Sequence, residues 1–186
     1  IGFLNSVNYY KEMVNVYYEY YHALQESAFI DEELGSTFEF GDDTRRGPHW
    51  FYSGAATYMA DYAVRKRNSN HNLGDMKAWL KQQFLFGTSL IEQNSCSDVT
   101  LKTISSDSCS RLWFYWGEPA VAYLLSSIDN PNALNDIFYP NIYSLGFKGA
   151  FELTFNKTLD EFYIEWDDIM QKSIDERIEL INSFGY

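Results

Sequence analysis

The apolar residues of this chain recur at the three- and four-residue spacing of α-helices, and this spacing constrains the fold more than any other feature. In the first such segment, which runs from about Ser6 to Ser27, Ser6 suits an N-cap and the apolar face consists of Tyr10, Met13, Val14, Tyr17, Tyr21 and Leu24. No alternating apolar and polar pattern of convincing strand length occurs in the sequence. We therefore predict an all-α fold, a multi-helix globular lobe.

The same spacing predicts further helices, separated by short polar or proline-containing segments. Pro48 opens a helix that runs to about Lys66, after a long irregular loop from Ala28 to Gly47. Asp75 caps the next helix, which Gly87 interrupts or bends. The later helices are expected over 111–127 (starting near Glu118 or kinked at Pro119), over 132–138 and ending before Pro140, over 147–155, and from the capping box at Thr158 to about Ser183.

Composition limits the class of protein. Hydrophobic residues make up 46% of the 186 residues and aromatic residues 18%, which favours a packed globule over a disordered segment. The net charge of −12 argues against a nucleic-acid partner, because phosphates bind basic surfaces. No apolar run approaches the roughly 20 residues of a transmembrane helix. No repeat or linker divides the chain, so we expect one domain over residues 1–186.

Two cysteines, Cys96 and Cys109, lie in a loop rich in serine, aspartate and threonine. A single disulfide between them fits an exported protein, in the periplasm, secreted or at the cell surface. Two free thiols are the alternative, whereas a zinc pair is disfavoured because neither cysteine has a Cys or His at ligand spacing. The chain begins at Ile1, without an initiator methionine, and we expect a processed product or a fragment.

Three segments together resemble one known family. Tyr18-Glu19-Tyr20-Tyr21-His22-Ala23-Leu24-Gln25 is similar to the His-Glu-x-x-His-x-x-Gln helix of the gluzincin (thermolysin-like) metallopeptidases. The segment from Pro48 to Tyr58, with Trp50-Phe51 and Gly54-Ala55-Ala56, resembles their Pro-x-Trp-Phe-x-Glu-Gly-x-Ala-x-Tyr helix, which supplies the third zinc ligand. Residues 147–166 resemble the C-terminal pattern of the helical lobe of that family. The order and spacing of the three match.

The resemblance implies a zinc site, yet the sequence departs from it at two ligand positions. By the match, Tyr18 stands in place of the first histidine and Ser53 in place of the glutamate, while His22 keeps the second ligand and Glu19 the general base. A phenol and a hydroxyl are poor zinc ligands at neutral pH. We therefore expect no cofactor and no catalytic metal, unless His22 and His49 form an improvised site.

Each candidate site residue has a functional and a structural interpretation. Glu19 and His22 form either an acid–base pair or a relict pair inside a helical core. Glu118 is either a general acid with a raised pKa or a carboxylate in the first turn of its helix. The aromatic excess, which includes Trp50 and Tyr115, either forms core and cleft walls or lines a groove for a peptide, a glycan or a partner subunit.

Two functional hypotheses and one structural hypothesis follow from these residues. The first is a catalytically degenerate metallopeptidase-like protein that acts as a binding module or as a subunit of a larger assembly, with a protein or peptide partner. The alternative is an active hydrolase with a rearranged site built from Glu19 and His22, with or without His49 or Glu118. In the structural one, the chain is a helical domain whose resemblance to peptidases is accidental, and Glu19, His22 and Ser53 do not converge in the fold.

Overall fold

The computed structural model describes residues 6–29, 40–67, 75–94, 96, 98–104, 109, 111–181 and 184. These ranges contain no β-strand, only an isolated bridge between Gly41 and Gly47, so the predicted all-α class is confirmed for them. In chain order the elements are α1 (Ser6–Phe29), α2 (His49–Arg67), α3 (Met76–Asn94), α4 (Leu112–Ser127), the π-helical turn η1 (Leu134–Phe138), α5 (Tyr139–Phe155), α6 (Leu159–Met170) and α7 (Ile174–Glu179).

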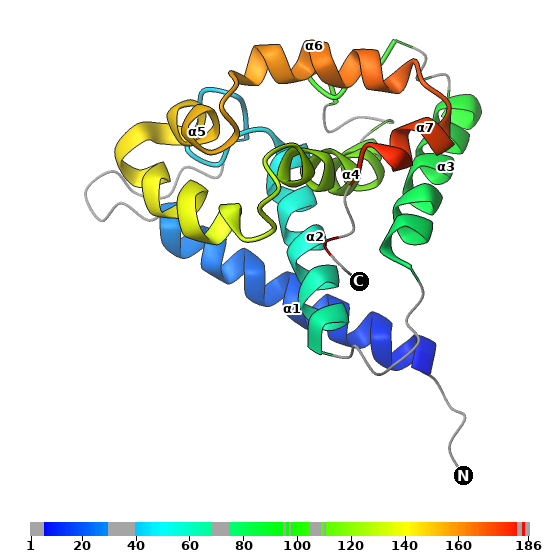
Figure 1. Cartoon of the computed structure of the whole chain (residues 1–186), viewed down its shortest axis with the longest axis horizontal. Coiled ribbons are helices and arrows are strands. Elements are labelled where there is room, and N and C mark those ends of the chain that lie inside the picture. The colour runs from blue at the N-terminus through cyan, green and yellow to red at the C-terminus, as the bar shows by residue number, and fades with distance from the viewer. Residues whose placement is uncertain are drawn as a thin grey trace.

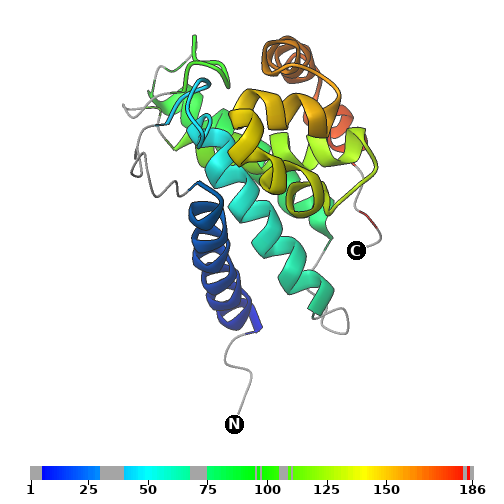
Figure 2. The same ribbon diagram turned by 90° about the vertical axis from the view of Figure 1, so that its left-hand side faces the viewer.

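Helices α2 and α4 form the centre of the molecule. Helix α4 packs against both α2 and α3, and α1 packs along the opposite side of α2 (Figure 1). Figure 2 shows α1 and α2 side by side, with α5 near the N-terminal half of α2. This arrangement places residues of α1 against residues near the start of α2, and it is the basis of the candidate site.

Glycines allow α2 and α4 to touch at the backbone. A Cβ atom added to Gly54 would lie 2.3 Å from the carbonyl carbon of Gly117, and one added to Gly117 would lie 2.4 Å from the carbonyl oxygen of Trp50. Neither position has room for a side chain. The small residues of α2 that follow, Ala55 and Ala56, are also fully buried, which makes α2 a core helix rather than an amphipathic surface helix.

The core is built largely from aromatic rings. Phe51 on α2 contacts Phe138, Phe147 and Phe151, which belong to η1 and α5. Trp166 and Phe162 on α6 continue the same cluster, with their ring centroids 6.0 Å apart. The residues expected to match the C-terminal helical pattern therefore lie in the core, where the large apolar area that they bury stabilises the fold.

The helix predicted over 111–127 is present as α4, which begins at Leu112 and contains Pro119, so it does not start near Glu118. Three other predicted helix boundaries differ from the structure. Helix α3 runs through Gly87 without interruption, and this glycine makes room for the indole of Trp116. Pro140 lies in the first turn of α5, a position that its missing N–H suits, instead of ending a helix. The segment after Thr158 forms two helices, because Ser173 starts a second capping box at α7.

The predicted disulfide is present between Cys96 and Cys109, whose Cα atoms are 6.2 Å apart. Both cysteines are buried. Among the described helices, none is long and apolar enough to cross a membrane.

Candidate functional site

Tyr18, His22 and Ser53 lie together at the interface of α1 and α2. Tyr18 and His22 are four residues apart and share the face of α1 that meets α2. The phenol oxygen of Tyr18 lies 3.4 Å from the hydroxyl oxygen of Ser53. The ring of His22 meets the ring of Tyr18 edge to face at 4.3 Å. We call these three residues the Tyr18 cluster.

A buried glutamine fixes the orientation of the His22 ring. The side-chain amide nitrogen of Gln25 donates to the backbone oxygen of Tyr52 at 3.0 Å and to the phenol oxygen of Tyr139 at 2.7 Å. Its carbonyl oxygen therefore accepts from Nδ1 of His22, at 2.6 Å. We assign the proton of the neutral imidazole to Nδ1 on this ground, which leaves Nε2 as an acceptor.

Burial keeps His22 neutral at physiological pH. Desolvation lowers the pKa of His22 below 6.5, and the hydrogen bond that His22 donates to Gln25 and the charges of Glu19 and Glu26 oppose this shift only in part. Glu19 itself is exposed on α1, three residues before His22. The structure therefore brings Tyr18, His22 and Ser53 together and leaves Glu19 at the solvent edge of the cluster.

The groups of the Tyr18 cluster do not fit a zinc ion. Burial raises the pKa of the Tyr18 phenol, so it remains protonated, and its oxygen faces the neutral hydroxyl of Ser53. His22 is the only imidazole of the cluster, whereas catalytic zinc in proteins is held by three protein ligands that are mostly imidazoles and carboxylates. In the part of the chain that the structure describes, no three His, Cys, Asp or Glu side chains are grouped to hold a metal.

An aromatic cavity lies beside the cluster, around His49. It has a volume of about 490 Å³, and its walls include Phe40, Asp42, His49, Lys102 and Trp113. The His49 ring is stacked between two of these walls, 4.3 Å from the ring of Phe40 and 3.9 Å from the ring of Trp113. We call this space the His49 cavity.

A row of rings connects the His49 cavity to the Tyr18 cluster. Tyr52 stacks on His22 at 4.4 Å and meets Phe40 edge to face at 5.2 Å. Burial lowers the pKa of His49, and the nearby His22 lowers it further. Both histidines are therefore neutral at pH 7, and they stand at two points of one continuous aromatic wall.

Trp50 and Tyr115 lie away from this wall. Trp50 is buried, and its indole nitrogen donates to the phenol of Tyr163 at 3.2 Å. The ring of Tyr115 contacts Phe86 of α3 and Phe114 of its own helix. The sequence pointed to both as binding residues because of their type, and the structure places them in packing positions outside the two sites described above.

Glu118 lies in the middle of α4, not in the first turn that the structural interpretation required. It is fully buried, and both carboxylate oxygens accept from the indole nitrogen of Trp79, at 3.1 and 3.0 Å. Desolvation and the neighbouring Asp61 raise the pKa of Glu118 well above 4.5. The predicted direction of the shift is thus present, but in the α2–α3–α4 interface and not at the His49 cavity.

Asp61 is a buried titratable group that the sequence analysis did not single out. It lies on α2, and its carboxylate accepts from Nε of Arg65 at 2.6 Å. Burial raises its pKa despite this ion pair. The sequence did contain a signal, since an aspartate four residues before an arginine on an otherwise apolar helix is the spacing of an intrahelical pair.

Comparisons of the chain with known family models, with curated proteins and with solved structures find no match. The function must therefore be inferred from the residues of the two sites.

Proposed function

We propose that this protein is a catalytically degenerate relative of the gluzincin helical lobe, which acts as a binding module or as a subunit of a larger assembly. The observation that supports this most is the contact between Tyr18 and Ser53. By the resemblance these two residues stand at zinc-ligand positions, and in the fold they lie 3.4 Å apart with His22 beside them. The three positions that would hold a zinc ion by the resemblance contact one another instead: Tyr18 and Ser53 through their hydroxyl groups, and Tyr18 and His22 through their rings.

Metal analysis of the purified protein tests the degenerate site. We expect zinc well below one equivalent after dialysis against zinc-containing buffer, with no change in the variant His22→Ala. A stoichiometric zinc ion that is lost in His22→Ala overturns the proposal. Because His22 is only half-buried, we expect His22→Ala to fold. Circular dichroism of the variant checks this.

The binding role is supported by apolar surface at two places. The His49 cavity exposes aromatic walls, with Phe40 at 40% exposure. On α1, Val16, Tyr20 and Leu24 are exposed and follow one another at four-residue intervals, so they form an apolar stripe on the helix surface. Aromatic and aliphatic anchors of this kind carry most of the affinity in protein and peptide recognition.

A peptide-binding experiment tests the role of the His49 cavity. We expect fluorescein-labelled peptides with aromatic anchors, selected from a random library, to bind the wild type, and Trp113→Ala to weaken that binding at least fivefold. Phe114→Ala is the matched control, because Phe114 is the next residue and is exposed, but it does not line the cavity. Equal losses in both variants contradict a site at the His49 cavity.

The alternative function is hydrolysis by a rearranged site, and one observation favours it. His22 is neutral at pH 7 with an acceptor nitrogen, and its ring contacts the ring of Tyr18, whose hydroxyl lies 3.4 Å from that of Ser53. A neutral imidazole of this kind is usable as a general base. Glu19, His49 and Glu118 were the other candidates, and of these Glu118 is sealed in the core. A screen of peptide and ester substrates with wild type, Glu19→Gln and His22→Gln tests this function. Equal background rates in all three exclude it.

A further inference from the structure

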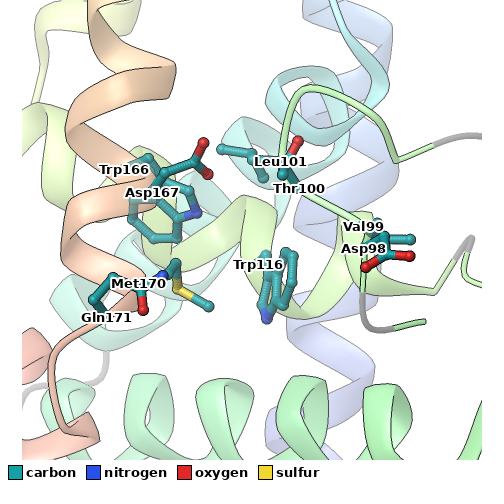
Figure 3. A pocket seen from close by; sticks show the side chains of 9 residues that line it. All are labelled: Asp98, Val99, Thr100, Leu101, Trp116, Trp166, Asp167, Met170 and Gln171. Atoms are coloured by element: carbon teal, nitrogen blue, oxygen red, sulfur yellow. The ribbon is translucent and has the colours of Figure 1, made fainter. Parts of the chain in front are cut away.

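A second cavity lies between the disulfide-closed loop and helix α6. It has a volume of about 300 Å³, at the small end of the range of about 300–1,000 Å³ in which proteins bind small molecules. Residues 98–101 form one wall, Trp116 of α4 forms the floor, and Trp166, Asp167 and Met170 of α6 form the other wall (Figure 3). We call it the Trp166 cavity.

The indole N–H of Trp166 is a buried donor without an acceptor. Trp166 is 1% exposed, and its indole nitrogen has no hydrogen-bond partner among the described residues. In Figure 3 this nitrogen lies on the edge of the ring that faces Trp116, across the cavity. Buried N–H groups are nearly always paired, because an unpaired one costs about 1–3 kcal/mol. An acceptor oxygen on the cavity side of the ring would pair this donor.

The indole N–H of Trp116 also lacks a partner, but it has another setting. A Cβ atom added to Gly87 would lie 2.4 Å from this nitrogen, so the N–H edge of Trp116 lies against α3. Trp116 contributes ring surface to the cavity, and Trp166 contributes ring surface together with a donor.

The charged side chains that line the Trp166 cavity, among the described residues, are all negative. Asp98 and Asp167 line it, and the described lining contains no lysine, arginine or histidine. Neither carboxylate forms an ion pair within the described part of the chain. Partial burial and the neighbouring Asp168 raise the pKa of Asp167. A carboxylate that lies beside a like charge and has no cation near it shows a shift in this direction.

Aromatic walls and carboxylates without a counter-ion are the two features that bind organic cations. Ring faces attract an ammonium group through their quadrupole, most strongly in tryptophan, and the attraction grows as the cation leaves water. The thioether of Met170 adds a polarisable, flexible surface for the alkyl part of a ligand. The same walls disfavour anions, which would meet two carboxylates and no positively charged side chain among the described lining residues.

We propose that the Trp166 cavity binds a small organic ammonium ion that carries a hydroxyl, ether or carbonyl oxygen. The cation lies against the tryptophan rings with Asp98 and Asp167 at the rim, and the oxygen accepts from the indole N–H of Trp166. The site is separate from the His49 cavity, and the proposal stands whether or not the protein is a degenerate peptidase.

Three small probes separate the parts of this proposal. Choline carries both the cation and a hydroxyl, tetramethylammonium carries the cation alone, and 3,3-dimethyl-1-butanol is the uncharged isostere of choline. Binding is followed by the ¹H–¹⁵N signal of the Trp166 indole, assigned with Trp166→Phe. We expect choline to bind with a dissociation constant of about 1 mM. Tetramethylammonium should bind a few-fold more weakly, and the neutral alcohol at least tenfold more weakly.

Variants test the residues. The double variant Asp98→Asn/Asp167→Asn should weaken choline at least tenfold. Asp168→Asn is the matched control, because it removes the same charge from the adjacent position outside the lining, and we expect it to change choline binding less than twofold. Trp166→Phe keeps most of the ring and removes the donor, so it should abolish the preference for choline over tetramethylammonium. For Trp166→Phe, binding is followed by the backbone signals of residues 98–101.

Two results would overturn the proposal. One is that the neutral alcohol binds as tightly as choline, which would make the cavity a merely apolar site. The other is that none of the three probes shifts the Trp166 signal at 50-fold above the expected dissociation constant in a protein whose thermal unfolding is cooperative. Either result leaves the Tyr18 cluster and the His49 cavity untouched, since neither residue set takes part in the experiment.

Discussion

At the scale of single residues, the pKa values of His22 and His49 reflect the burial and the charges along the aromatic wall. His22 and His49 have pKa values below 6.5 because burial disfavours the imidazolium, and the charge of His22 lowers the pKa of His49 further. The histidine titrations followed by NMR should therefore show both midpoints below 6.5. In His22→Gln the midpoint of His49 should move up, because its positive neighbour is gone.

Glu19→Gln is the complementary variant. The negative charge of Glu19 raises the pKa of His22, so its removal should move the His22 midpoint down. Midpoints of His22 and His49 that do not respond to either variant would mean that the two rings and Glu19 are farther apart in solution than in the structure.

The buried pair Glu118 and Asp61 makes stability depend on pH. The folded state raises the pKa of Glu118, so the native protein keeps a proton that the unfolded chain releases above about pH 4.5. The contribution is therefore complete below this value and is lost as pH rises toward the folded pKa, at about 1.4 kcal/mol per pH unit. In Glu118→Gln, an uncharged near-isostere, this loss should be absent.

The measurement is urea unfolding of wild type and Glu118→Gln at pH 5, 6 and 7. From pH 5 to pH 7, the unfolding free energy of the wild type should fall relative to that of Glu118→Gln by at least 1 kcal/mol. Glu152→Gln, at an exposed position of α5, controls for the loss of a charge. A difference that stays constant with pH would contradict a protonated Glu118 in the native state.

At the scale of elements, the crossing of α2 and α4 depends on two glycines. Gly54→Ala would push a methyl group into the backbone of Gly117, where no flexible side chain can yield. We expect a loss of about 3 kcal/mol in unfolding free energy, at the upper end of overpacking effects. At Gly41 the added Cβ would meet only Thr44 Cγ2, at 3.7 Å, so Gly41→Ala is the control and should change stability by about 0.5 kcal/mol or less. A loss below 1 kcal/mol in Gly54→Ala would contradict the close crossing.

Local patterns in the sequence predicted the helices well where periodicity and caps act alone. The capping box of Thr158, the helix opened after Pro48 and the disulfide all occur as expected. The errors fall where a distant residue decides the outcome. Gly87 does not end α3, because it faces the indole of Trp116, and no local pattern at Gly87 contains that tryptophan.

In the candidate site, too, the sequence predicted what one helix decides and missed what distant segments decide. The helical spacing of Tyr18 and His22 predicted a shared face, but the contact with Ser53 depends on how α1 and α2 pack. Phe40 and Trp113 enter the aromatic wall from segments far apart in the sequence, so the stacking of His49 between them had no local signal. For His71, the polar, asparagine-rich sequence around it favours a solvated side chain, and this position lies outside the described residues.

At the scale of the whole molecule, the protein combines a strongly acidic charge with aromatic recesses at two different places. The net charge of −12 favours basic or cationic partners through long-range attraction. The disulfide-closed loop contributes to both recesses, with residues 98–101 at the Trp166 cavity and Lys102 and Ile104 at the His49 cavity. The loop thereby connects the two proposed binding sites.

The central claim is that Tyr18 and Ser53 occupy the positions of two zinc ligands, and restoring those ligands tests it most directly. Zinc bound after equilibrium dialysis should be near zero for the wild type and near one equivalent for the folded double variant Tyr18→His/Ser53→Glu. The control Tyr20→His/Ser53→Glu has the same composition, but Tyr20 is exposed on another face of α1, so it should bind no more zinc than wild type. A folded double variant that binds no more zinc than this control would contradict the claim.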